Sequence, residues 1–284
     1  MAILMSQTNI PFPGNSAPIG VFDSGVGGLT VVREIMRALP EESIIYFGDT
    51  ARVPYGSKSK ETVTKYSRQI IRFLNTQHVK AIVVACNTAS AMALDEIEKE
   101  IKIPIIGVVK PGAKVASETT KNGKIGVIGT EAMIRSNIYP SYLEQINSNV
   151  EVIGKPCPLF VPLVEEGLLQ DPVTDEIAMR YLSVLIDCNI DTLILGCTHY
   201  PLIRSTIARI MGEKVKLVNP AYETAWELKR MLEQENLLCN ARPGLGGNQY
   251  QFFVSDAAEK FRNFANSILK YGILSAKTIN IEEY

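Results

Sequence analysis

The sequence predicts an α/β fold built from two pseudo-symmetric, doubly wound parallel-sheet domains that face each other across a cleft. Short apolar runs alternate with longer segments whose apolar residues recur at helical spacing. The apolar runs are nearly continuous, which is typical of parallel strands covered by helices on both faces. The chain also resembles itself, because Ile19-Gly20-Val21 and Ile125-Gly126-Val127 each open a strand that is followed by a turn and a helix.

Nine strands are predicted, each a run of β-branched and other apolar residues. Several of these runs end at a glycine, an aspartate, an asparagine or a cysteine, where the chain turns toward a helical pattern. The predicted strands cover residues 18–23, 43–49, 81–86, 103–109, 124–129, 150–155, 192–197, 215–220 and 250–255.

Amphipathic helices are predicted between these strands. Residues 29–39 (LTVVREIMRAL), 62–77 (TVTKYSRQIIRFLNTQ) and 91–101 (AMALDEIEKEI) carry apolar residues at positions that share one helix face. Each of these segments has an apolar stripe long enough to cover one face of a sheet. The alternation of strand and helix is therefore the pattern of doubly wound parallel sheets.

The self-similarity also predicts the domain boundaries. AIVVACNT (81–88) and TLILGCTH (192–199) both place a cysteine at the end of an apolar strand, at a similar offset from the first pair of matching strands. A duplicated α/β unit would put Cys86 and Cys197 on opposite walls of one cleft. We expect a loose leader over residues 1–17, a first domain over 18–110 plus 221–284, and a second over 111–220.

Composition and charge exclude several classes of protein. Of 284 residues, 46% are hydrophobic and 21% charged, as in ordinary globular proteins. Lys plus Arg number 29 and Asp plus Glu number 30, with no basic stripe, which argues against a nucleic acid or an anionic membrane as partner. No apolar run approaches the roughly 18 residues of a membrane span, and the leader does not have the pattern of a signal peptide. Five scattered cysteines indicate reduced thiols in a cytoplasmic protein.

Polar residues follow the predicted strands at the edge where a parallel sheet binds its ligands. Ligands of open α/β sheets lie outside the carboxyl ends of the strands. The residues at these ends, which share one edge if the strands are as predicted, are Asp23, Ser24, Asp49, Thr50, Cys86, Asn87, Thr88, Gly129, Thr130, Cys197, Thr198 and His199.

Cys86 and Cys197 are the candidate reactive thiols. For a single cysteine, a buried strand end is the more frequent role. Both of these, however, are followed by hydrogen-bonding side chains and then by a helical pattern. A thiol at a helix N-terminus has its thiolate stabilised by free N–H groups and the helix dipole. We read the other three cysteines, Cys157, Cys188 and Cys239, as structural.

The glycine-rich loop VFDSGVGGLTVV (21–32) has two interpretations. One is a dinucleotide-binding loop, with Asp49 at the end of the next strand holding a ribose hydroxyl. The pattern fails in detail, because Thr30 occupies the final glycine position. We favour a loop whose backbone N–H groups, together with Ser24, hold a small anion such as a carboxylate.

His199 and Glu165 are further candidates. A lone histidine is more often structural, but His199 lies two residues after a candidate thiol, whereas His78 belongs to a polar helix end. No metal site is expected, because Cys-x-His has no second ligand pair at zinc spacing. Glu165 and Glu166 read by default as surface carboxylates of a helix. Residues 48–58 form a Gly/Pro-bounded loop suited to contacting a substrate.

Together these motifs resemble the glutamate racemases of bacterial cell-wall synthesis. The combination is specific, and weaker similarity continues through ETAWELKRML and the last strand and helix. The matching segments are IGVFDSGVGGLTV (19–31), GDTARVPYG (48–56), VVACNTASA (83–91), GVIGT (126–130), CPLFVPLVEEG (157–167) and LGCTHYPLI (195–203).

The resemblance implies a cofactor-independent enzyme that interconverts L- and D-glutamate in the cytoplasm, supplies D-glutamate for peptidoglycan, and forms a homodimer. Its active site would lie between the two domains. It implies that Cys86 and Cys197 are the two acid/base residues, that Asp23 and His199 assist them, and that Glu165 is a further catalytic carboxylate. The implied substrate contacts are Asp23, Ser24, Tyr55, Gly56, Asn87, Thr88, Thr198 and His199.

A two-thiol site suits racemisation, because a proton must leave one face of the α-carbon and another must reach the opposite face. Two functions of other classes remain as alternatives. A nicotinamide-dependent oxidoreductase would use the glycine loop and Asp49, and tight NAD(H) binding would identify it. A small-anion sensor would bind glutamate with unreactive thiols, and would leave L-glutamate optically unchanged.

Overall fold

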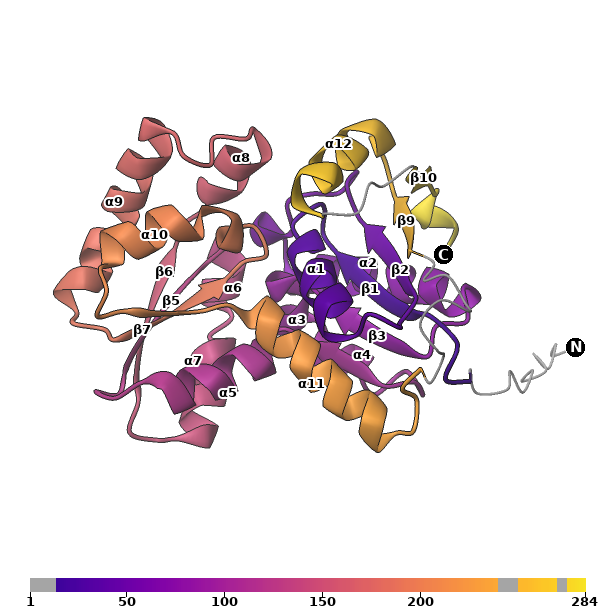
Figure 1. Cartoon of the computed structure of the whole chain (residues 1–284), viewed down its shortest axis with the longest axis horizontal. Helices are drawn as coiled ribbons and strands as arrows, with labels where there is room; N and C mark the ends of the chain where they lie inside the picture. The colour runs from indigo at the N-terminus through magenta and orange to yellow at the C-terminus, as the bar shows by residue number, and fades with distance from the viewer. Residues whose placement is uncertain (1–13, 240–249, 270–274) are drawn as a thin grey trace, which may run out of the picture.

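Two parallel β-sheets, each with helices on both faces, make up the computed structural model, which describes residues 14–239, 250–269 and 275–284 (Figure 1). One sheet has the strand order β10 (Lys277–Thr278), β9 (Tyr250–Val254), β2 (Ile44–Gly48), β1 (Ile19–Asp23), β3 (Ala81–Val84) and β4 (Ile105–Gly107). The other has the order β6 (Glu151–Pro156), β5 (Lys124–Gly129), β7 (Thr192–Gly196) and β8 (Lys216–Val218). Every strand pair in these residues is parallel.

All nine predicted strands are present, with ends that agree with the predicted ones within two residues. The segment predicted over 215–220 ends as a strand at Val218, because Asn219 caps a helix that begins at Pro220, its side chain accepting the Ala221 N–H at 3.1 Å. The predicted strand over 103–109 shortens to β4 because Val109 already belongs to a helix. The two-residue strand β10 was not predicted, since two residues are too short for a periodic signal.

Two of the three predicted helices match the structure, and the third is divided. Helices α1 (Leu29–Ala38) and α2 (Lys60–Thr76) agree with the predicted ranges within two residues. The single helix predicted over 91–101 is wrong: α3 (Asn87–Met92) begins earlier and α4 (Leu94–Ile97) follows it. The Ser90 hydroxyl donates to Val84 O at 3.0 Å and so holds α3 to the end of its strand, and the break at Ala93 then lets Leu94 and Ile97 enter the core.

The remaining helices complete the layers. They are α5 (Val109–Thr119), α6 (Glu131–Arg135), α7 (Ile138–Ile146), α8 (Phe160–Glu165), α9 (Pro172–Asp187), α10 (Arg204–Met211), α11 (Pro220–Gln234) and α12 (Ala258–Ile268). Three short 3₁₀ helices are η1 (Tyr55–Ser57), η2 (Tyr200–Ile203) and η3 (Ile281–Glu283). None of the helices in the described ranges is long and apolar enough to cross a membrane.

Each sheet separates two hydrophobic cores, as the continuous apolar strands predicted. In β1, Ile19 and Val21 pack in the core with α1, α11 and α12, whereas Phe22 points to the core formed with α2 and α3. In the smaller sheet, alternate strand residues face α8, α9 and α10 on one side and α5 and α7 on the other. Because alternate residues of a strand point to opposite faces, both faces must be apolar. The doubly wound α/β class is therefore confirmed.

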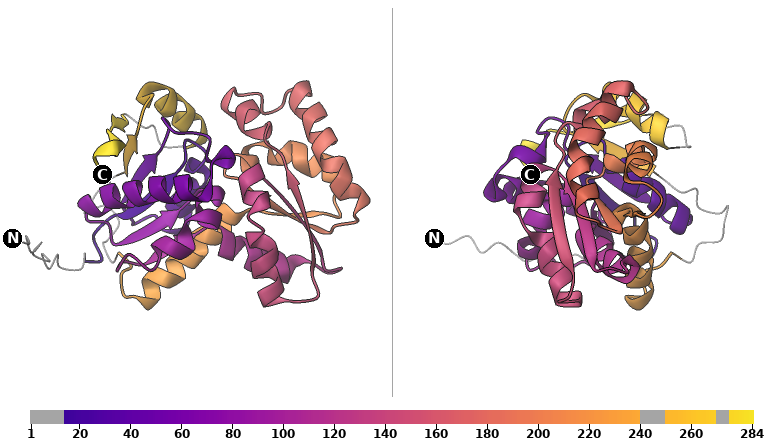
Figure 2. Two further views of the ribbon diagram at one scale, coloured as in Figure 1. Left: turned by 180° about the vertical axis from the view of Figure 1, so that it is seen from behind. Right: turned by 90° about the vertical axis from the view of Figure 1, so that its left-hand side faces the viewer.

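The two sheets share one topology. In each, the first strand along the chain lies between the second and the third, and the fourth lies beyond the third: β2-β1-β3-β4 and β6-β5-β7-β8. This equivalence makes β3 the counterpart of β7, so Cys86 and Cys197 follow corresponding strands. The two units lie side by side, with α11 packed against both α1 and α5 (Figures 1 and 2).

Strand membership supports the domain division expected from the sequence. The larger sheet draws its strands from residues 19–107 and 250–278, and the smaller from 124–218. We therefore propose that residues 18–110 with 221–284, and residues 111–220, are the two domains. Residues 1–13 of the predicted leader lie outside the described residues.

Candidate active site

The carboxyl ends of the two sheets enclose a cavity that contains both candidate thiols. Its volume of about 40 Å³ is enough for only a few water molecules, so the cleft is narrow. Among the predicted site residues, those that line it are Ser24, Tyr55, Gly56, Cys86, Asn87, Thr88, Glu165, Cys197, Thr198 and His199. The lining is completed by Val53, Pro54, Thr130, Val161 and Gly196, and Asp23 lies behind Thr198 rather than on the cavity wall.

Cys86 lies where β3 gives way to α3, and it is the N-cap of that helix. Its Sγ accepts the Ala89 N–H at 3.5 Å, and its S–H donates to Ser24 Oγ at 3.6 Å. Burial and the nearby Asp23 carboxylate nevertheless raise the pKa of the thiol to about 12. The N–H of Ala89 at the helix N-terminus does act to lower the pKa, as expected, but desolvation outweighs it, so the expected net lowering does not occur. Cys86 is a protonated thiol here.

Cys197 has a different local structure from Cys86. It directly follows β7, but the next element is the 3₁₀ helix η2 rather than an α-helix, and α10 begins only at Arg204. Tyr200 N–H donates to Cys197 O at 3.1 Å, and Leu202 N–H to His199 O at 3.0 Å, which is the three-residue spacing of a 3₁₀ turn. The prediction of an α-helix N-terminus at this thiol is therefore wrong. The neighbour of its Sγ is instead His199 Nδ1, 3.8 Å away.

His199 connects Cys197 to Glu165. Its Nε2 lies 2.9 Å from Oε1 of Glu165, the last residue of α8. Burial alone would lower the pKa of the imidazole, but its hydrogen bonds to Cys197 and Glu165 outweigh that effect and raise the pKa to about 10. The same hydrogen bond lowers the pKa of Glu165. At neutral pH His199 is therefore a cation held between a sulfur and a carboxylate. His78, by contrast, is exposed just after α2.

Asp23 ends β1 and is completely buried. Its Oδ2 accepts the Gly25 N–H at 3.0 Å, and its Oδ1 accepts the Thr198 hydroxyl at 3.4 Å. Desolvation raises the pKa of this carboxyl, although the His199 charge acts in the opposite direction. Asp23 can therefore hold a proton at a higher pH than an exposed aspartate does.

The glycine-rich loop forms a contact between the two sheets. A Cβ on Gly27 would lie 2.3 Å from Thr198 Oγ1 and 2.6 Å from His199 Nδ1, so this position requires glycine. In the first turn of α1, which follows the glycines, the Thr30 hydroxyl donates a hydrogen bond to Thr198 O at 3.0 Å. The loop thus fixes the Cys197 side of the cavity against the Cys86 side. That it holds an anion stays a prediction.

Asp49 is engaged in structural contacts, which argues against the dinucleotide interpretation. Its carboxylate is fully buried and accepts hydrogen bonds from Arg52 Nε at 2.7 Å, Ser255 Oγ at 2.8 Å and the Tyr55 hydroxyl. No oxygen of Asp49 is left to hold a ribose. These contacts instead anchor the loop of residues 48–58, which carries Tyr55 and Gly56 to the cavity wall.

Two polar contacts across the cleft were not predicted. Thr130, the N-cap of α6, lies on the cavity wall with its hydroxyl 2.9 Å from that of Thr88. The Tyr139 hydroxyl, from α7, donates to Asn87 Oδ1 at 3.0 Å. Thr130 was named at the sheet edge but not chosen, although its place after β5 was a usable signal. Nothing in the local sequence around Tyr139 indicates its role.

Comparison with known proteins agrees with this geometry. Residues 19–228 match the family model described as Asp/Glu/Hydantoin racemase. The chain is 51% identical over 251 residues to the glutamate racemase of Geobacter metallireducens, an alignment that covers 88% of this chain and 92% of that protein. The chain belongs to the Asp/Glu/hydantoin racemase family, among its glutamate racemases.

Solved structures of glutamate racemases share the fold. An isoform from Bacillus anthracis superposes with a TM-score of 0.89 at 41% identity, covering 93% of this chain and 98% of that one. The Francisella tularensis glutamate racemase, solved in complex with D-glutamate, gives a TM-score of 0.88 at 41% identity, with 95% and 100% covered. Glutamate racemases are isomerases, so membership of this group makes the protein an enzyme of that class.

Proposed function

We propose that this protein racemises glutamate by passing protons between its α-carbon and two thiols, Cys86 and Cys197. The observation that carries the proposal is that the two thiols follow equivalent strands and line the same narrow cavity. A substrate between them presents one face of its α-carbon to each sulfur. The D-glutamate in the Francisella tularensis complex supports the choice of substrate.

In one direction, a Cys197 thiolate takes the α-proton and becomes a thiol, while the Cys86 thiol gives its proton to the opposite face and becomes a thiolate. In the other direction the roles are exchanged. Each cycle removes one proton and returns one, and it moves no electrons to an acceptor. We therefore propose that the reaction needs no cofactor. The raised pKa of Cys86 suits the first direction, because the group that donates must begin protonated.

The two thiols have different assisting groups. We propose that the His199 cation, held by Glu165, stabilises negative charge on Cys197 through the Nδ1 contact. We propose that Asp23 is already protonated when Cys86 becomes a thiolate, and keeps its proton through the step, since its raised pKa allows it to be neutral beside that charge. The acid and base are thus the same residue type in two unlike environments.

The substrate carboxylate must be stabilised as the α-proton leaves, because negative charge then spreads into it. Hydroxyl, amide and backbone N–H donors converge on the cavity, and in a closed site without bulk water they stabilise charge strongly. The residues on the cavity wall that we propose for substrate binding are Ser24, Tyr55, Gly56, Asn87, Thr88, Thr198 and His199. Asp23, also expected to contact the substrate, lies behind Thr198, and we propose that it acts through that residue. Because the empty cavity is small, the two sheets must separate to admit glutamate.

We expect Gly27→Ala to lower kcat/KM by about 10²-fold, because the added methyl group displaces Thr198 and His199 from their places beside Cys197. The clash should also lower the free energy of unfolding by about 1–3 kcal/mol. Gly14→Ala is the matched control, since its Cβ would meet nothing within 4 Å. Steady-state kinetics and urea unfolding of both variants test this, and a fully active Gly27→Ala enzyme would contradict the role given to this loop.

We propose, from the family resemblance, that the D-glutamate formed serves peptidoglycan synthesis in the cytoplasm and that the enzyme is a homodimer. The decisive experiment is to incubate purified protein with L-glutamate, with no cofactor added, and to follow D-glutamate by chiral chromatography. We expect a racemic mixture. Unchanged L-glutamate would refute the proposal and favour a sensor, whereas a requirement for NAD(H) would favour an oxidoreductase.

A further inference from the structure

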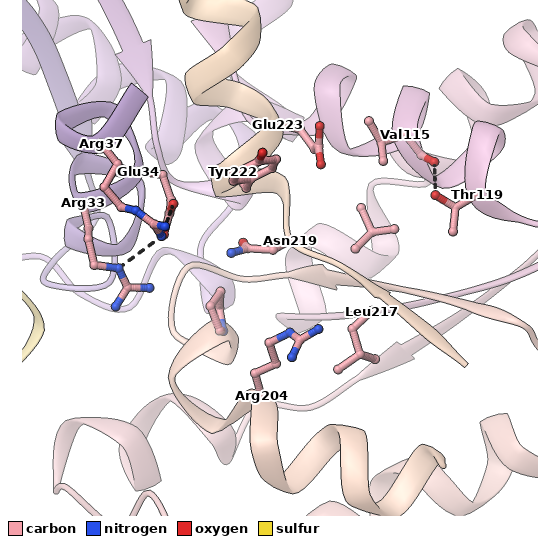
Figure 3. A pocket seen from close by; sticks show the side chains of 12 residues that line it. Arg33, Glu34, Arg37, Val115, Thr119, Arg204, Leu217, Asn219, Tyr222 and Glu223 are labelled. Atoms are coloured by element: carbon pink, nitrogen blue, oxygen red, sulfur yellow. Dashed lines mark hydrogen bonds and ion pairs between the residues drawn. The ribbon is translucent and has the colours of Figure 1, made fainter. Parts of the chain in front are cut away.

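A second and larger cavity, of about 400 Å³, lies where β8 passes into α11. Its walls come from both units: Arg33 and Arg37 from α1, Arg204 from the start of α10, Asn219 at the N-cap of α11, and Tyr222 in the first turn of that helix (Figure 3). None of its lining residues belongs to the catalytic cavity. It is therefore a separate site, and the chemistry proposed above does not use it.

The wall of this cavity carries more positive charge than its carboxylates neutralise. Arg33 Nε lies 3.3 Å from one oxygen of Glu34, and Arg37 Nη1 lies 3.2 Å from the other, so a single buried carboxylate serves two guanidinium groups. For Arg204, no ion-pair or hydrogen-bond partner exists within residues 14–239, 250–269 and 275–284. Figure 3 shows Arg204 facing the cavity from a different helix than Arg33 and Arg37. Glu223 is the other carboxylate on the wall, so the lining holds three guanidinium groups and two carboxylates, Glu34 and Glu223.

The concave shape of this second cavity limits the size of the ligand that it can bind. The arginines line a concave cavity and do not form an extended stripe, and the chain as a whole has a net charge of −1. A long polyanion such as a nucleic acid needs a continuous basic surface. Guanidinium groups bind carboxylate and phosphate oxygens through paired, charge-assisted hydrogen bonds. The arrangement therefore fits a compact anion.

We propose that this cavity binds a small anion with two or more negative charges, a phosphate or a polycarboxylate, between Arg204 on one side and Arg33 and Arg37 on the other. Such a ligand would connect the two units. Helix α1 begins directly after the loop that contains Gly27, and Arg204 follows His199 by five residues. The anion would thus bridge the two segments that carry opposite sides of the catalytic cleft.

The test is isothermal titration calorimetry of the full chain at low ionic strength, with inorganic phosphate and citrate titrated separately. We expect saturable binding of at least one of them below about 1 mM, weakened by added salt. Arg204→Gln should reduce the affinity at least about tenfold, since it removes one charged donor from the site. Comparing the two ligands shows whether phosphate or carboxylate groups are preferred.

Arg209→Gln is the matched control, because Arg209 lies on the same helix but pairs with Asp175 outside the cavity. It should bind the anion as the unmodified protein does. Should Arg204→Gln fail to fold, Arg37→Gln repeats the test at a well-exposed side chain. Absence of binding by the unmodified protein up to about 10 mM would overturn the proposal. Equal affinity of the Arg204→Gln and unmodified proteins would also overturn it, since the anion would then bind elsewhere. Neither readout depends on racemase activity.

Discussion

Replacing either cleft thiol by a hydroxyl, Cys86→Ser or Cys197→Ser, is expected to lower kcat/KM for glutamate racemisation by about 10³- to 10⁴-fold. A serine hydroxyl is a far weaker acid than a thiol, so one face of the α-carbon loses its proton donor and acceptor. Chiral chromatography measures the loss in both directions. Cys188→Ser is the control, because Cys188 caps the end of α9, outside the cavity lining.

Solvent deuterium separates a two-thiol mechanism from a general loss of structure. In D₂O, each single variant should still exchange the α-hydrogen of the enantiomer that faces its remaining thiol, while inversion is nearly abolished. Proton NMR of the recovered glutamate shows this directly. Full racemase activity in either variant would refute the mechanism. Loss of exchange as well as inversion in a folded variant would show that one thiol cannot act without the other.

His199→Gln is expected to lower kcat/KM by about 10²-fold, the second largest effect. Glutamine can donate a hydrogen bond, but it cannot supply the positive charge that lies between Cys197 and Glu165. The loss must be equal for L- and D-glutamate, because the enantiomers have equal free energy in water and the equilibrium constant is one. The individual kcat values can differ. An unequal loss in kcat/KM would reveal an assay error, and an undiminished kcat/KM would contradict the role of His199.

The same variant tests the protonation of His199 through stability. The pKa of this imidazole rises from 6.5 to about 10 on folding, so the stabilisation is fully present below about pH 6.5 and is lost as the pH rises through about 10. Urea unfolding between about pH 7 and 10 should therefore show unmodified protein losing stability relative to His199→Gln. His78→Gln, at an exposed position, should follow the unmodified protein. Parallel curves for all three proteins would show that His199 is not a cation.

Much of the architecture could be predicted from sequence, because strands buried on both faces carry a local signature. The runs at 81–86 and 192–197 are apolar apart from Thr192, and both are central strands with helices on each side. The helix predicted over 91–101 failed, since its division at Ala93 depends on how Ser90 is tied to β3 and not on periodicity. Likewise, the helix expected after Cys197 became a 3₁₀ turn.

The sequence by itself determined which residues reach the carboxyl ends of the strands, and the repeat determined that Cys86 and Cys197 are equivalent. That information is local, because an alternating pattern of strands and helices dictates which residues follow each strand. Only the tertiary structure decided which side chains meet: Glu165 beside His199, Tyr139 on Asn87, and Thr130 on Thr88. It also decided protonation, since a pKa depends on burial and on charges brought close by distant segments. Cys86 is a thiol because it is buried near Asp23, and His199 is a cation because Cys197 and Glu165 lie against its two ring nitrogens.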